Sequence, residues 1–229
     1  MQTFCTLCPR NCHADRKHGN SGVCGMPSEA ILVRAARHDG EEPCISGTRG
    51  SGTIFFAGCP LGCVYCQNDA ISRPAALQSA LTRTVDAKQL RAIALQLAET
   101  GVHNINFVTP THYSHLLAEA IGNGFGIPTV YNCGGYEKTE TLRTLQGKID
   151  IYMPDLKYLL PEPAARYSHA PDYPARATEA ICEMVRQTGP FVMDEDGILR
   201  RGVLIRHLVL PGAGKNTRGV IDMLAQLPQ

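Results

Sequence analysis

Short apolar runs alternate with amphipathic stretches over residues 50–229 of the chain. The runs are rich in β-branched and aromatic residues, which predicts five buried strands: "TIFFAG" (53–58), "NINFVT" (104–109), "IPTVYN" (127–132), "IDIYMPDL" (149–156) and "GVLIRHLVL" (202–210). Apolar residues at helical spacing predict helices near 86–100, 112–122, 137–146, 174–188 and 217–227. Strands that alternate with helices, most of them apolar on both faces, predict an α/β fold with a parallel sheet covered by helices.

Polar residues gather where these predicted strands end. Thr109 and Thr111 follow the second strand, Asn132 follows the third, and Asp155 and Lys157 follow the fourth. The fifth strand carries Arg206 near its end. Because the carboxyl ends of parallel strands share one edge of a sheet, these side chains are expected to surround one site.

Composition places limits on size, partners and compartment. A chain of 229 residues that is 44% hydrophobic can bury one α/β domain, predicted at 49–229, beside a small cysteine-rich N-terminal module at 1–48. A formal net charge of +1 argues against nucleic acid or an anionic membrane surface as a partner. With no apolar run long enough to span a membrane and no signal-peptide pattern at the start, we expect a cytoplasmic protein.

Eight of the ten cysteines lie in the first third of the chain. In the cytoplasm thiols stay reduced, so clustered cysteines there indicate metal ligands or redox groups rather than disulfides. Nearby, "RHDGEEP" (37–43) is interpreted as a solvated turn whose Glu41 and Glu42 could meet a partner.

The stretch "GCPLGCVYCQN" (58–68) supplies Cys59, Cys63 and Cys66 directly after the first predicted strand. A [4Fe–4S] cluster normally takes four thiolates, so a loop with three leaves one iron open to another ligand. Two glycines and a proline let such a loop bend around the cluster. A structural zinc site is the alternative, although zinc usually takes four protein ligands from paired cysteines.

A second set of cysteines lies near the N-terminus. Two, three and eleven residues separate its members in turn, and these are Cys5, Cys8, Cys12 and Cys24. The spacing permits a closed site of four thiolates, which either a structural zinc ion or an auxiliary iron–sulfur cluster would fit.

The cysteine loop and the strand ends together resemble a known family, the radical S-adenosylmethionine (SAM) enzymes. The loop at the end of the first strand matches their signature, and further segments resemble the pyruvate formate-lyase activating enzyme-like branch: "CTLCPRNC", "NINFVTPTHY", "YNCGGYE", "DIYMPDLKY" and "IRHLVLPG". This resemblance covers nearly the whole chain. It implies a partial (β/α)6 barrel.

The resemblance also implies cofactors and roles for individual residues. SAM would bind the open iron of a [4Fe–4S] cluster and be cleaved reductively to a 5′-deoxyadenosyl radical. By position, Tyr65 would flank the adenine and Arg206 would meet the SAM carboxylate, while Asn132, Asp155 and Lys157 correspond to positions that contact SAM or substrate. Thr109 and Thr111 stand where many members carry a Gly-Gly-Glu segment, and a sixth strand is expected but not found.

Three classes of function fit these observations. The first is an activase that abstracts hydrogen from a glycyl radical enzyme, supplied with electrons by a flavodoxin or ferredoxin-type donor. The second is a radical SAM enzyme acting on a small molecule or peptide. The third is a non-enzymatic iron–sulfur or zinc-binding module, which four thiolates around the first site would favour over the three present.

Overall fold

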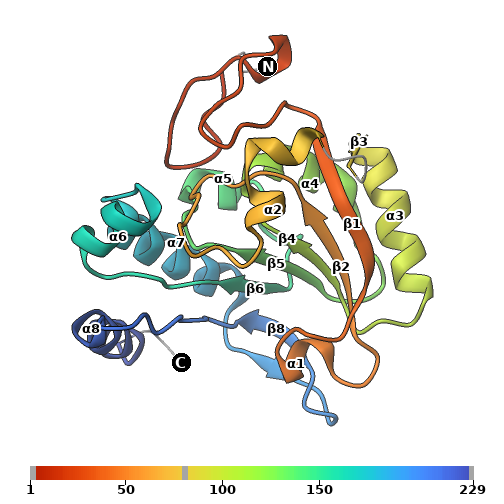
Figure 1. The fold of residues 1–229 in the computed structure, drawn as a ribbon. Helices are drawn as coiled ribbons and strands as arrows, with labels where there is room; N and C mark the ends of the chain where they lie inside the picture. The colour runs from red at the N-terminus through yellow and green to blue at the C-terminus, as the bar shows by residue number, and fades with distance from the viewer. Residues whose placement is uncertain (1–3, 79–81, 227–229) are drawn as a thin grey trace.

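The computed structural model describes residues 4–78 and 82–226 and has a mixed α/β fold (Figure 1). Its strands are β1 (Ala30–His38), β2 (Ser51–Phe56), β3 (Arg83–Val85), β4 (Ile105–Val108), β5 (Thr129–Cys133), β6 (Ile151–Pro154), β7 (Val192–Met193) and β8 (Leu199–Val203). They form one eight-stranded sheet within the described residues, in the order β3-β1-β2-β4-β5-β6-β8-β7.

The five predicted strands are confirmed as the parallel part of this sheet. β2, β4, β5, β6 and β8 pair in parallel, with Gly52 opposite Ile105 and Val108 opposite Asn132. The three strands that were not predicted, β1, β3 and β7, pair antiparallel at the two sides. The sheet is therefore mixed: its centre is parallel as predicted, and the strands at its sides are antiparallel additions.

The last predicted strand, 202–210, was wrong in extent, because β8 covers Leu199–Val203. Backbone bonds to β6 continue beyond it, from Leu204 N–H to the Tyr152 carbonyl and from Arg206 N–H to the Pro154 carbonyl. Pro154 has no N–H to return a bond to this segment, so the regular ladder is interrupted there. It resumes as an isolated bridge between Asp155 and Arg206, which holds these two charged residues side by side.

Helices flank the sheet within the described residues. They are α1 (Pro43–Ser46), α2 (Asp69–Ser72), α3 (Ala87–Glu99), α4 (Ser114–Ile121), α5 (Thr139–Arg143), α6 (Pro161–Ser168), α7 (Tyr173–Thr188) and α8 (Gly214–Leu224). Each of the five predicted helices has a counterpart among them. A capping box fixes the start of α3, because the Asp86 carboxylate accepts from Gln89 N–H at 2.7 Å and the Gln89 side chain accepts from Asp86 N–H at 3.0 Å.

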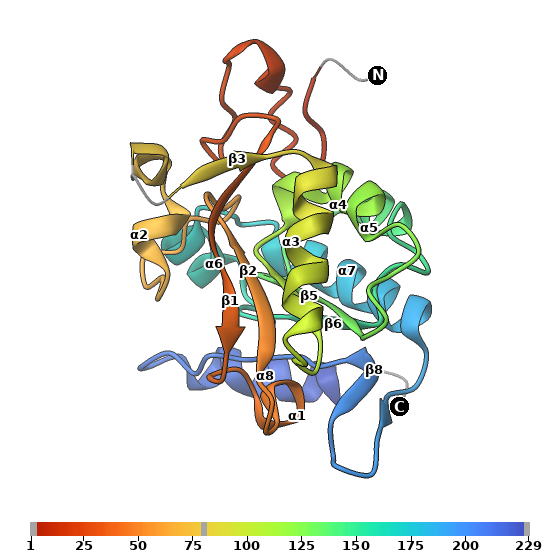
Figure 2. The same ribbon diagram turned by 90° about the vertical axis from the view of Figure 1, so that its right-hand side faces the viewer.

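The core lies on both faces of the sheet. Alternate residues such as Ile54, Phe107 and Tyr131 pack against α3 and α4, which run along one face (Figure 2). The opposite face carries a smaller apolar cluster in which Ile45 of α1 meets residues of β5 and β6. The short helix α1 thus covers part of the second face and leaves the ends of the strands free to line a cavity.

The segment before β1 has little regular structure and lies against the carboxyl ends of the parallel strands. Arg16 donates to the Met26 carbonyl at 3.0 Å and to the His112 carbonyl, just after β4, at 2.7 Å. Lys138 and Thr141, at the start of α5, donate to carbonyls of residues 6 and 7. Within the described ranges, no helix is both long enough and apolar enough to cross a membrane.

Candidate functional site

A cavity of about 900 Å³ opens at the carboxyl ends of the parallel strands. Its walls contain nine residues predicted from the sequence: Cys59, Cys63, Tyr65, Cys66, Thr109, Asn132, Asp155, Lys157 and Arg206. The most distant of these residues, Cys59 and Arg206, are 147 positions apart, and the parallel order of the strands brings them together. The tenth, Thr111, is buried outside the cavity wall.

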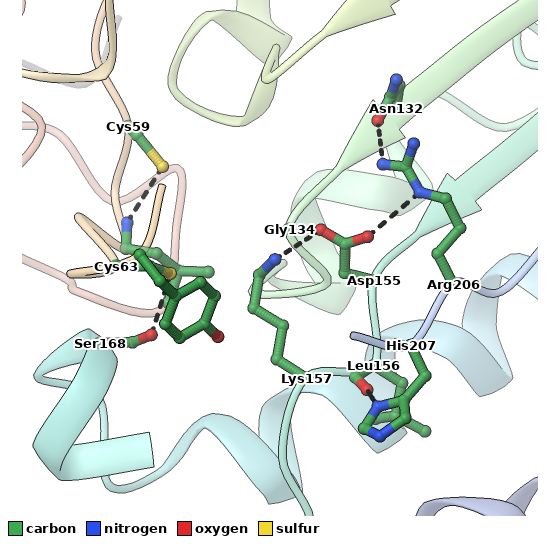
Figure 3. Close-up of polar contacts among 12 residues, drawn as sticks. Cys59, Cys63, Asn132, Gly134, Asp155, Leu156, Lys157, Ser168, Arg206 and His207 are labelled. Atoms are coloured by element: carbon green, nitrogen blue, oxygen red, sulfur yellow. Dashed lines mark hydrogen bonds and ion pairs between the residues drawn. The ribbon is translucent and has the colours of Figure 1, made fainter. Parts of the chain in front are cut away.

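The cysteine loop follows β2 through backbone conformations that suit glycine. Gly58 has φ +83° and Gly62 has φ +62°, and a Cβ on Gly58 would overlap Met26 of the N-terminal segment. Inside the loop, Leu61 N–H donates to Cys59 Sγ at 3.4 Å (Figure 3). Amide donors of this kind stabilise negative charge on sulfur.

Cys63 is tied to a chain of hydroxyl groups. Ser168, the last residue of α6, donates to Cys63 Sγ at 2.9 Å (Figure 3). The Ser168 hydroxyl is bonded in turn to the Tyr158 hydroxyl at 2.8 Å, and Tyr158 is bonded to Tyr65. This chain fixes the Tyr65 side chain in the cavity wall.

The donor set suits an iron–sulfur cluster or another thiophilic metal. Burial raises the pKa of the Cys59 thiol to about 11, although hydrogen bonds from the Gly62 and Leu61 amides lower it. A bound metal cation would therefore be needed to stabilise the Cys59 thiolate. Among the residues described, no group of three or more His, Cys, Asp or Glu side chains is arranged to hold a metal ion. The cluster assignment therefore stays a prediction that the thiol chemistry fits.

Two cations contact Asp155 near the ends of β6 and β8, and the Asn132 amide at the end of β5 contacts one of them. The Asp155 carboxylate lies 2.6 Å from Lys157 Nζ and 3.1 Å from Arg206 Nε, and Arg206 Nη2 donates to Asn132 Oδ1 at 2.6 Å (Figure 3). Desolvation lowers the pKa of Lys157, but the negative charge of Asp155 outweighs this effect and holds the pKa above its ordinary value. Asp155 therefore orients both cations toward the cavity.

Glu41 and Glu42 extend this group from the connection between β1 and α1. Their carboxylates lie 3.7 and 3.6 Å from Arg206 Nη1, and Glu41 accepts from Asn106 at 3.1 Å. The Glu41 side chain is only 9% exposed, so the interpretation of this stretch as a solvated turn was wrong at Glu41, whereas Asp39 and Gly40 are exposed. The sequence indicated that Glu41 and Glu42 could meet a partner, but it did not indicate that the partner is Arg206.

Thr109 lines the cavity in a strained conformation. Its φ of +55° is rare for a β-branched residue and costs about 1–3 kcal/mol. Its N–H donates to the Asn132 carbonyl at 2.8 Å, which turns the chain away from β4 just at the cavity. Such strain is concentrated at binding sites, because surrounding structure must maintain it.

Thr111 contacts a buried carboxylate, Glu137, that was not predicted. The Thr111 hydroxyl donates to Glu137 at 2.6 Å and the Tyr131 hydroxyl donates at 2.9 Å. Burial raises the pKa of Glu137 to about 7, although these donors and Cys133 oppose the shift. Glu137 stands in "YNCGGYE" and links the segments after β4 and β5 behind the cavity wall.

The N-terminal cysteines lie in the segment that packs against the strand ends. Cys8 and Cys24 are buried, whereas Cys5 and Cys12 are partly exposed. Burial raises the pKa of Cys8 to about 12, with smaller contributions from Cys24 and Cys5 in its surroundings. Arg16 Nη1 lies 3.6 Å from Cys5 Sγ. A metal shared by these four residues stays a prediction.

Comparison with known proteins adds one relative. The chain is 28% identical over 216 residues to the uncharacterized protein MJ0674 of Methanocaldococcus jannaschii. The match covers 90% of this chain and 57% of that protein, so the chain spans little more than half the length of this relative. No family model matches the chain.

Proposed function

We propose that this protein is a radical SAM enzyme, built on a partial (β/α)6 barrel, whose Cys59, Cys63 and Cys66 hold a [4Fe–4S] cluster. One observation carries the proposal: three thiols of a single loop and the charged ends of the parallel strands line the same cavity. When bound, the cluster supplies the electron that cleaves SAM to methionine and a 5′-deoxyadenosyl radical, which takes a hydrogen atom from the substrate.

The residues of the cavity would bind and orient SAM. Lys157 and Arg206 offer cations to its carboxylate, and Asp155 keeps both in place through the contacts at 2.6 and 3.1 Å. The Tyr65 ring, fixed by Tyr158, would flank the adenine. Thr111 would act through Glu137 by supporting the turn at Thr109, rather than by touching SAM.

For the substrate, we favour a glycyl radical enzyme, with a flavodoxin or ferredoxin-type protein as electron donor. Two large apolar side chains are exposed beside the cavity: Val64 in the cysteine loop at 58% and Leu208 in the cavity wall at 47%. A protein that docks over the cavity would cover both side chains, which supports a protein substrate. A reducing cytoplasm would preserve the thiols and the cluster.

Reductive cleavage of SAM tests this function. Protein reconstituted with iron and sulfide, reduced with dithionite and given SAM should form 5′-deoxyadenosine. Replacing Cys59, Cys63 and Cys66 together by Ala should abolish the product, while Cys182→Ala, at an exposed cysteine of α7, should not change it. Undiminished product from the triple variant would rule out the assignment.

A further inference from the structure

Four consecutive carbonyls of the cysteine loop are held by two arginines. Arg10 donates from Nε to the Pro60 carbonyl at 2.8 Å and from Nη2 to the Leu61 carbonyl at 3.3 Å. Arg73 donates to the Gly62 carbonyl at 3.1 Å and to the Cys63 carbonyl at 3.2 Å. Arg10 therefore holds the first half of the loop between Cys59 and Cys63, and Arg73 holds the second half.

Arg10 also connects this loop to the end of α6. It donates to the Ser168 carbonyl at 2.8 Å and to the His169 carbonyl, and its guanidinium lies over the Tyr136 ring at 5.3 Å. A guanidinium offers five N–H donors in a fixed plane, so one Arg side chain can hold several carbonyls in a defined geometry. No other common side chain has this capacity.

The two peptide units that Arg10 holds are the ones whose N–H groups serve Cys59. In a trans peptide the carbonyl and the N–H point in opposite directions, so fixing the carbonyls of Pro60 and Leu61 aims the next two N–H groups the other way. Those are the N–H of Leu61, which donates to Cys59 Sγ at 3.4 Å, and the N–H of Gly62, whose hydrogen bond favours the Cys59 thiolate.

We propose that Arg10 is a positioning residue for the cluster site, which aims the Leu61 and Gly62 amides at the Cys59 sulfur. The N-terminal segment then forms part of the site through Arg10. The contribution to the loop geometry stands on the contacts alone, and the effect on a cluster rests on the proposed function. Amides directed at a cluster sulfur stabilise the reduced, more negative state, so Arg10 raises the reduction potential.

Arg10→Gln tests this proposal, with Arg176→Gln, an exposed arginine of α7, as the matched control. In the reduced protein without metal, amide hydrogen exchange at Leu61 and Gly62 should become faster by about tenfold or more, because the restraint on their peptide units is lost. At equal iron content, the reconstituted variant should have a lower midpoint potential than the wild type. Arg10→Lys, which keeps the charge but not the planar donors, should fall between the two.

Unchanged exchange at Leu61 and Gly62 in Arg10→Gln, or an equal change in Arg176→Gln, would overturn the proposal. An unchanged potential at equal iron content would overturn the effect on the cluster. If the wild type takes up no cluster, the proposed function fails, while the exchange measurement still decides whether Arg10 positions the loop. If Arg10→Gln does not fold, Arg10→Lys carries both measurements.

Discussion

At the scale of single residues, the site depends on a close approach at Gly135. This glycine follows β5 with φ +77°, and a Cβ at this position would overlap the carbonyl oxygen of Asp155 and lie 2.9 Å from Tyr173 Oη. Tyr173 donates to the same Asp155 carbonyl at 2.8 Å. Only glycine combines this φ with this lack of space, which brings the ends of β5 and β6 together at the cavity.

We expect Gly135→Ala to lower the free energy of unfolding by about 2–4 kcal/mol, because conformational cost and overlap add. Gly147→Ala is the control, since Gly147 has a similar φ of +75° but no neighbouring atom within 4 Å of an added Cβ. It should cost only about 1 kcal/mol. Urea unfolding of the two variants measures both changes. An equal decrease in the free energy of unfolding would mean that the overlap at Gly135 adds no cost.

Asp155 is the carboxylate that keeps two cations in the cavity wall. Asp155→Asn keeps the shape of the side chain but leaves Lys157 without its charged partner, so SAM affinity should fall by about tenfold or more, or ~1.4 kcal/mol. Titration calorimetry would measure the affinity, with the cluster absorbance unchanged. Asp194→Asn, which removes the ion pair with Arg200 in the β7–β8 hairpin, serves as the control. Unchanged SAM affinity in Asp155→Asn would mean that Asp155 does not position Lys157 and Arg206 for SAM.

At the scale of secondary structure, β4 and β5 are joined beyond their ends by Glu137. Its carboxyl has an ordinary pKa of 4.5 and a pKa of about 7 in the folded protein. Between these values the folded state binds more protons than the unfolded state, so stability should decrease as pH rises from 4.5 to 7. The decrease attributable to this group is about 3 kcal/mol.

Glu137→Gln should remove this dependence, because the amide keeps a hydrogen-bonding side chain that does not titrate. Urea unfolding at pH 5 and pH 8 would show a smaller difference between the two pH values than in the wild type. Glu162→Gln, at an exposed position in α6, should leave the difference unchanged. A wild-type protein equally stable at both pH values, with the same result for Glu137→Gln, would contradict the raised pKa.

The elements that could be predicted are those whose pattern is local. The strand at 53–58 is largely apolar on both faces, the strand at 104–109 is apolar on one face, and the helix at 86–100 carries its own capping residues. β1, the antiparallel partner of β2, was not predicted. It contains several polar residues and lies beside the cysteine-rich segment, so its pattern was not interpreted as a strand. The regular hydrogen-bond ladder after β8 is interrupted by Pro154, which lies in β6. The sequence of β8 itself therefore gives no sign of the interruption.

At the scale of the whole molecule, the candidate site was predictable as far as parallel strand order determines it. Strand ends such as Asn132 and Asp155 meet at one edge in any such sheet, and they do so here. Glu41 and Arg10 could not be placed in this way, because they come from irregular segments that cross the strand ends. Their positions follow from tertiary contacts with Arg206 and with the cysteine loop.

The N-terminal segment is expected to hold a second metal through Cys5, Cys8, Cys12 and Cys24. The chain there is packed closely around these cysteines: a Cβ on Gly22 would lie 3.3 Å from Ala14 Cβ and against the sulfur of Cys12. A variant lacking Cys59, Cys63 and Cys66 removes the loop ligands but keeps all four N-terminal thiols. Purified without oxygen and analysed for metals, it should retain about one zinc ion, or the iron and sulfide of one cluster, per chain. Ser replacement of Cys8 and Cys24 in the same background should remove that metal, because two thiolates hold neither group firmly. If the variant with all four N-terminal cysteines contains no metal, the segment serves the site through packing and Arg10 alone.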